Sequence, residues 1–165
     1  MPALNKISTI ALTLSLAAAV ASAQGVRTEK NISLELANQL AAASVAACAA
    51  NGYNVAATVL DRAGVVKAVQ RADNAGPHTL GASQQKAFTS ASAKSNTQAM
   101  MEGAQKTPGA ANLTDIPGFL LLGGGVPVKA GNEVIGAVGV AGAPGGHLDE
   151  QCALAALDKV KDQLK

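Results

Sequence analysis

Residues 123–146 read GGGVPVKAGNEVIGAVGVAGAPGG, and this stretch decides the fold. Two short arms rich in valine and isoleucine flank a turn at Lys129–Asn132, which predicts a β-hairpin. Glycine recurs at every third position of the second arm, at Gly136, Gly139 and Gly142. Glycine inside a strand indicates a bulge or a close approach by another group. We interpret the spacing as a helix packed closely on the sheet, with a ligand over the strand end as the alternative.

The hairpin belongs to an alternation of helical and strand patterns along the chain. Apolar residues at helical spacing follow Ser33, a suitable N-cap, and end at Asn51–Gly52. The other segments are predicted as strands at 54–60, 65–71 and 118–122, helices at 78–94, after Asn96 and at 148–164, and a loop at 105–117. Because short turns join successive strands, we predict an α+β fold. Its layered α-β-α architecture has helices flanking a mainly antiparallel five-stranded sheet.

Residues 1–23 have the pattern of a secretory signal peptide. Lys6 provides a positive charge, residues 7–20 form an apolar core, and Ala21-Ser22-Ala23 is a cleavage pattern for signal peptidase. The apolar run is shorter than the ~20 residues of a membrane span. We therefore expect residues 24–165 to form one exported domain, periplasmic or secreted, with no membrane span after processing. An uncleaved anchor is the alternative.

The composition excludes one class of function and disfavours others. The formal net charge is +2 without a basic block, and the only aromatic residues are Tyr53, Phe88 and Phe119. Nucleic-acid binding needs a cationic surface and usually stacking rings, so we exclude it. The glycines do not follow the G-x-G-x-x-G pattern of nucleotide sites, and no Gly-x-Ser-x-Gly, His-Glu-x-x-His or Cys-x-x-Cys motif occurs. We therefore expect a binding module rather than an enzyme.

The two cysteines predict a disulfide bond. Cys48 lies late in the first predicted helix and Cys152 early in the last one. If these helices run antiparallel on one face of the sheet, the two positions meet. Exported proteins use paired cysteines mainly as disulfides. Two unpaired buried thiols are the alternative.

The two histidines are the first candidates for a binding site. His78 follows Gly76-Pro77, His147 follows Gly145-Gly146, and each stands near the start of a predicted helix. An imidazole nitrogen is a common ligand of haem iron. His78 is our first choice because the Gly-Pro pair fixes the backbone before it, and His147 is its rival. The alternative for each is a capping or solvated histidine. Three cationic residues could bind the carboxylates of a haem, and the alternative is that they form a solvated rim: Lys67, Arg71 and Lys86.

Several motifs resemble the GlcG/HbpS-like family of haem-binding proteins. They are Ala75-Gly76-Pro77-His78-Thr79, the stretch from Ala82 to Thr89 that ends in KAFT, GGGVPV from Gly123, and GAVGVAGAPGG followed by Asp149-Glu150-x-Cys152. The resemblance covers nearly all of residues 24–165. It implies an α-β-α fold around an antiparallel sheet, homo-oligomeric assembly, and binding of haem or iron linked to extracytoplasmic sensing or haem handling. It adds Thr79 to the haem-binding candidates His78, His147, Arg71 and Lys86.

Three functions compete on these observations. The first is an exported haem-binding module without turnover, in which His78 is the metal ligand and haem the cofactor. The second is an interaction module without a ligand, acting as an accessory subunit of a periplasmic enzyme or receptor. The third is an enzyme that acts on a small metabolite or degrades haem slowly.

Overall fold

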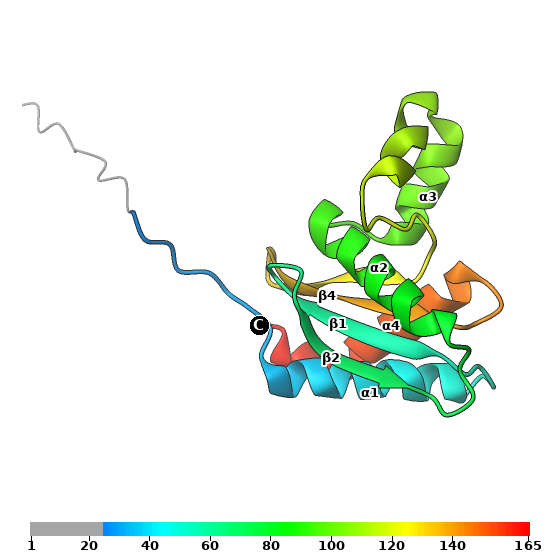
Figure 1. Ribbon diagram of the computed structural model, residues 1–165. Coiled ribbons are helices and arrows are strands. Elements are labelled where there is room, and N and C mark those ends of the chain that lie inside the picture. The colour runs from blue at the N-terminus through cyan, green and yellow to red at the C-terminus, as the bar shows by residue number, and fades with distance from the viewer. Residues whose placement is uncertain (1–24) are drawn as a thin grey trace, which may run out of the picture.

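The computed structural model describes residues 25–165, so the signal-peptide prediction lies outside the described residues. The elements are α1 (Leu34–Ala49), β1 (Ala56–Asp61), β2 (Val66–Arg71), α2 (His78–Ala93), α3 (Thr97–Lys106), η1 (Pro108–Asp115), β3 (Gly125–Ala130), β4 (Glu133–Ala141), α4 (Gly146–Val160) and η2 (Lys161–Gln163). Figure 1 shows a central sheet with α1 and α4 on one face and α2 on the other. The predicted α-β-α layering is confirmed.

The sheet has four strands in the described part of the chain, in the order β2-β1-β4-β3, and every pairing is antiparallel. The predicted hairpin is β3–β4, with Ala130 opposite Glu133. The expectation of a fifth strand at 118–122 is wrong. Backbone groups of this segment are bound by side chains instead, because Leu120 N donates to Thr89 Oγ1 and Leu122 O accepts from Thr97 Oγ1. A segment held in this way lies against helices and does not join the sheet.

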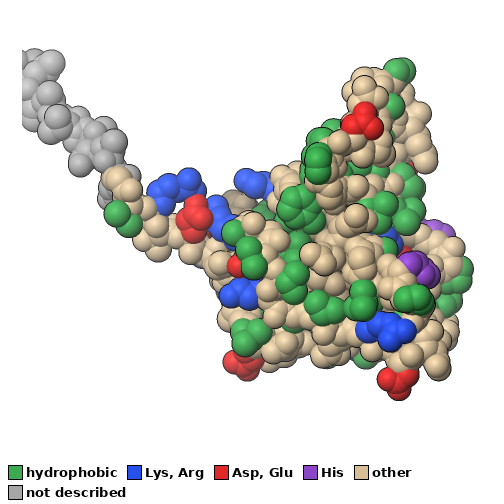
Figure 2. Space-filling model, viewed as in Figure 1, with side chains coloured by type: hydrophobic (Ala, Val, Ile, Leu, Met, Phe, Trp, Pro, Cys, Tyr) green, Lys and Arg blue, Asp and Glu red, His purple; other side chains and the backbone are tan. Residues whose placement is uncertain are grey.

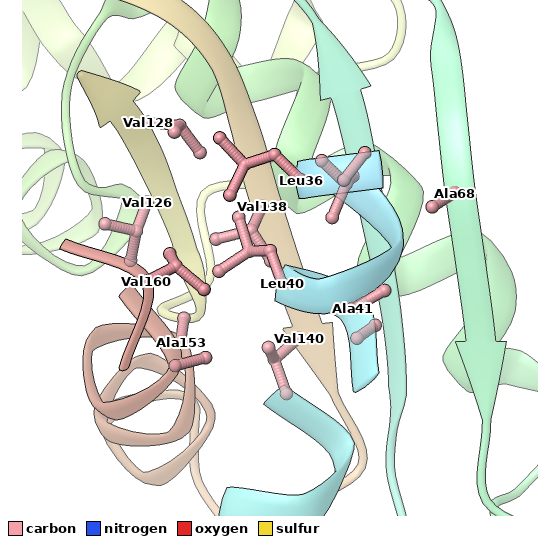
Figure 3. Close-up of a cluster of buried hydrophobic side chains, with 14 of the residues drawn as sticks. Leu36, Leu40, Ala41, Ala68, Val126, Val128, Val138, Val140, Ala153 and Val160 are labelled. Carbon is pink, nitrogen blue, oxygen red and sulfur yellow. The ribbon is translucent and has the colours of Figure 1, made fainter. Parts of the chain in front are cut away.

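The main apolar core lies between the sheet and the α1–α4 pair. Ser33 caps α1 by accepting a hydrogen bond from Leu36 N, as predicted. Leu40 of α1, Ala153 of α4 and Val138 and Val140 of β4 are fully buried in this layer (Figure 3). The chain places Val, Leu and Ala here and almost no rings, so the helices sit close to the sheet.

The opposite face of the sheet packs against α2 through very small residues. A Cβ atom at Gly139 would lie 2.0 Å from Ser83 O and 2.6 Å from Ala87 N, and one at Gly125 would lie 2.2 Å from Lys86 O. A side chain at either position would therefore collide with the helix backbone. The interpretation of the Gly139 position as a closely packed helix is confirmed. Thr58 of β1 and Ser83 of α2 add a buried hydrogen bond of 2.7 Å between their hydroxyls.

The segment after α2 projects away from the layered body (Figure 1). It consists of α3 and η1, so the region predicted as a loop at 105–117 contains a 3-10 helix. Thr97 is the only buried residue of these two elements. Within residues 25–165, no helix has both the length and the apolar character needed to cross a membrane.

Candidate functional site

His78 is the first residue of α2, and its side chain is exposed. The loop before it is held by two side chains that the sequence analysis assigned to ligand binding. Arg71, the last residue of β2, donates from Nη2 to Ala75 O. Thr79 donates from Oγ1 to Gly76 O at 2.7 Å, and its own backbone N–H binds the same oxygen at 3.0 Å. Thr79 is 1% exposed, so its hydroxyl secures the loop from inside.

Lys86 lies in the interior, and the expectation of an exposed rim position is wrong. Its Nζ is 2.7 Å from Asp149 Oδ2 and donates to Val140 O at 3.0 Å. The side chains of Lys86 and Asp149 are 1% and 3% exposed. The helical pattern alone does not show this, because Asp149 stands 63 positions away in the sequence. Lys67, at the bulge of β2, is half-buried.

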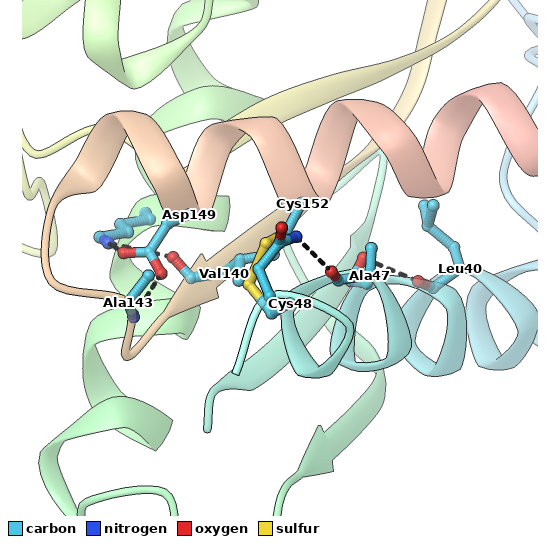
Figure 4. The surroundings of a disulfide bond; sticks show 10 residues. Leu40, Ala47, Cys48, Val140, Ala143, Asp149 and Cys152 are labelled. Atoms are coloured by element: carbon cyan, nitrogen blue, oxygen red, sulfur yellow. Dashed lines mark hydrogen bonds and ion pairs between the residues drawn. A yellow bond between two sulfur atoms is a disulfide. The ribbon is translucent and has the colours of Figure 1, made fainter. Parts of the chain in front are cut away.

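Burial opposes the charges of this ion pair. Removal from water lowers the pKa of Lys86, and the attraction of Asp149 only partly offsets this. Desolvation likewise raises the pKa of Asp149, against the influence of Lys86 and of backbone N–H donors. Two charges buried together are stabilised mainly by their direct contact and by further hydrogen bonds. Asp149 has such a bond, because Ala143 N donates to its Oδ1 at 2.9 Å (Figure 4).

The ion pair joins α2 to α4 and to the loop between β4 and α4. Lys86 belongs to α2, Asp149 belongs to the first turn of α4, and Ala143 lies in the Gly142–Gly145 loop. In the sequence, Asp149 stood out only as part of the motif Asp149-Glu150-x-Cys152, with no role of its own. The two acidic residues Asp149 and Glu150, four and five positions after the Gly142–Gly145 loop, are the sequence feature that could have indicated a buried partner for Lys86. Glu150 also binds across elements, accepting hydrogen bonds from Asn96 Nδ2 at 2.9 Å and Gln98 N at 3.3 Å at the start of α3.

His147 is the second residue of α4, and its side chain is exposed like that of His78. In Figure 2 the histidine side chains lie at the end of the molecule away from the N-terminal segment. This end is where α2 and α4 begin. The structure therefore brings the starts of the two histidine-bearing helices to the same end of the fold.

A cavity of about 210 Å³ lies between these helix starts. His78 borders it, Lys86 and Asp149 lie beneath it, and the 141–146 segment forms its other wall. His147 does not border this cavity. A larger cavity of about 520 Å³ lies elsewhere, between α2, the β1–β2 turn and Pro117-Gly118, and is lined by none of the predicted site residues. We place the candidate site at the smaller cavity because the histidine and the buried ion pair occur there.

The predicted disulfide bond is present. Cys48 and Cys152 join α1 to α4, with their Cα atoms 5.3 Å apart (Figure 4). The helices are antiparallel, because Gln163 just after α4 donates to Gln39 early in α1 at 2.7 Å. Cys152 stands one turn after the Asp149 position. The bond therefore ties the first half of α4 to the last turn of α1.

No cluster of three or more His, Cys, Asp or Glu side chains is arranged to hold a metal ion within residues 25–165. A protein site for a bare cation usually supplies three or more ligands. Haem differs, since the porphyrin supplies most of the iron's ligands and the protein adds one or two axial groups. A single exposed histidine is therefore compatible with a group that brings most of its own metal ligands.

Comparison with known proteins gives consistent matches. The family described as "Haem degrading protein HbpS-like" matches residues 32–158. GlcG from Escherichia coli strain K12 is 33% identical over 115 residues, which span 70% of this chain and 84% of GlcG. A double mutant of Streptomyces reticuli HbpS is 34% identical with a TM-score of 0.77, covering 96% of this chain and 99% of that one. A PduOC–haem complex has a TM-score of 0.69 over 78% of this chain and 94% of that chain. At 21% identity, it shares the fold alone.

Proposed function

The chain belongs to the family described as haem degrading protein HbpS-like, and we propose that it is an exported module that binds haem, with His78 as the iron ligand. The observation that carries this proposal is the position of His78. Its exposed imidazole borders the cavity between α2 and the 141–146 segment. The other predicted histidine, His147, does not border it.

The residues present fit haem at a surface rather than in an enclosed pocket. Pockets that enclose a ligand measure roughly 300–1,000 Å³, whereas the His78 cavity has about 210 Å³. If haem binds at this surface, the His78 imidazole would hold its iron. When bound, the haem would supply an iron centre for sensing, transfer or redox chemistry.

Arg71 is the cation best placed to assist. It is exposed and lies beside the loop that carries His78. A guanidinium has five N–H donors, and the bond to Ala75 O uses only one of its nitrogens. Lys86 does not suit a carboxylate partner, because Asp149 already holds its ammonium group in the interior. We therefore assign the binding of a haem carboxylate to Arg71 and a supporting role to Lys86.

Export and homo-oligomeric assembly complete the proposal. The leader pattern at residues 1–23 supports a periplasmic or secreted location, where a disulfide is stable. Exposed valines along the edge of the sheet support assembly: Val65, Val66 and Val69 are 60%, 42% and 46% exposed. Edge strands that expose apolar residues pair readily with other chains. Light scattering of the purified protein measures the assembly, and a protein that is monomeric throughout would remove this part of the proposal.

Titration of the purified protein with hemin tests the proposal. A binding module gives a saturable Soret band that is distinct from that of free hemin and persists over time. Slow degradation of haem is the second candidate, favoured by the family description. It predicts that the same band forms and then decays when ascorbate and oxygen are added. An absorbance that rises without saturation would refute both and leave an accessory module without a ligand.

A further inference from the structure

His78 and His147 share one local arrangement. Each ring lies over the glycine two residues before it, within Gly76-Pro77-His78 and Gly145-Gly146-His147. A Cβ atom at Gly76 would lie 2.7 Å from Cε1 and 2.9 Å from Nδ1 of His78. At Gly145 the same distances to His147 are 2.8 and 2.9 Å. The glycine leaves the space that the ring occupies.

The need for glycine at these positions is one of space and not of backbone conformation. Gly145 has φ −152°, an extended value that any residue adopts. Gly76 is not among the glycines with positive φ. Alanine at either position would therefore fit the backbone, and Gly76 precedes a proline, where extended conformations are preferred. The conflict arises only with the imidazole.

The ring, and not the loop, would move to relieve such a conflict. Arg71 Nη2 holds Ala75 O, and Thr79 holds Gly76 O through both its hydroxyl and its backbone N–H. The imidazole stands at the free end of an exposed side chain and can rotate to another rotamer at low cost. A methyl group at position 76 thus reorients the ring while the fold stays intact.

We propose that Gly76 is a positioning residue for His78: only a residue without a side chain leaves room for the direction in which the imidazole presents its nitrogens. Gly145 does the same for His147. This inference rests on the proposed function for its consequence, because the ring direction matters only if His78 binds iron. The orientation itself is a property of the protein without ligand.

The test uses the Gly76→Ala and Gly145→Ala variants, with Gly81→Ala as the matched control. Gly81 lies in α2, and a Cβ atom there would have nothing within 4 Å. The Cε1–H signals of the two histidines are recorded by NMR in the purified protein without ligand. The spectrum of the His78→Ala variant shows which signal belongs to which histidine. We expect Gly76→Ala to move the His78 signal alone, Gly145→Ala to move the His147 signal alone, and Gly81→Ala to move neither.

Hemin titrations then follow the consequence. Gly76→Ala should shift the Soret maximum towards that of His78→Ala, and should add no change when introduced into His78→Ala. Unmoved histidine signals in both glycine variants would overturn the inference, as would a Soret shift by Gly76→Ala that persists without His78. A wild-type protein that fails to bind hemin would instead refute the proposed function. The NMR signals would still decide whether the two glycines set the orientation of the imidazole rings. Should Gly76→Ala fail to fold, Gly145→Ala decides the same question at His147.

Discussion

Lys86 and Asp149 form an ion pair of 2.7 Å in the interior, between helices that begin with the two histidine segments. Lys86 lies about two turns after His78, and Asp149 lies two residues after His147. The carboxylate also holds the loop through Ala143 N. This pair therefore ties together the two helix starts and the loop that surround the candidate site.

Breaking this pair should cost much stability. Removal of one partner of a buried pair costs about 3–5 kcal/mol, because the other charge is left buried alone. We expect Lys86→Met and Asp149→Asn each to lower the free energy of unfolding by an amount of that order. The double variant should lose less than the sum, with a coupling of about 0.5–3 kcal/mol. Urea unfolding of the four proteins measures the cycle.

An exposed pair on the same chain provides the control. Lys161 Nζ and Asp158 Oδ1 are 2.9 Å apart, but the side chains are 65% and 73% exposed. Surface pairs contribute about 0–1 kcal/mol, so Lys161→Met should change stability little. Equal losses at the two sites, or strictly additive losses at the buried one, would contradict the account.

The disulfide should stabilise the fold without taking part in binding. Cys48 and Cys152 are 104 positions apart. Loss of a native disulfide in a small exported domain costs about 2–5 kcal/mol. Replacing both cysteines by alanine should lower the melting temperature and make it insensitive to reductant, while hemin binding by the folded variant remains. Two freely labelled thiols in the native protein would show that the bond does not form.

The close approach of α2 to the sheet predicts a strong effect at Gly139. A methyl group there meets Ser83 O and Ala87 N, which belong to the backbone and cannot rotate away. We expect Gly139→Ala to lower the unfolding free energy by about 1–3 kcal/mol, the usual cost of overpacking. Gly103→Ala in α3, where nothing lies within 4 Å, should instead stabilise the protein by up to ~1 kcal/mol. Thermal or urea unfolding compares the two, and an unchanged Gly139→Ala would contradict the packing.

These cases show which parts of the molecule the sequence predicts. Local patterns identified the hairpin, the cap at Ser33 and the helix that begins at His78, because turn residues and periodicity act over a few positions. The prediction of a strand at 118–122 was wrong. Its apolar residues suit a strand, but Thr89 and Thr97 bind its backbone groups in place of a neighbouring strand. The surroundings of the other side chains depend on the three-dimensional fold and not on neighbouring residues in the sequence. No local pattern pairs Lys86 with Asp149, which stands 63 positions away. The burial of Lys86 could therefore not be predicted from the sequence, and the lysine was expected on an exposed rim.

Export should be visible at the N-terminus of the mature protein. The small-x-small pattern ending at Ala23 predicts cleavage before Gln24. Intact-mass analysis of protein from the periplasm or medium should give a chain that begins near Gln24. A variant with Ala21 and Ala23 changed to bulky residues should keep the leader. Protein recovered outside the cytoplasm with Met1 still present would contradict this prediction.

We propose that His78 binds the iron of haem, and one comparison tests this most directly. We compare hemin titrations of the wild-type protein, His78→Ala and His147→Ala, after circular dichroism has shown that all three are folded. Both histidines are exposed, so neither substitution removes a buried contact. We expect His78→Ala to abolish or shift the Soret maximum and His147→Ala to leave it unchanged. A His78→Ala protein with the wild-type Soret spectrum would contradict this proposal.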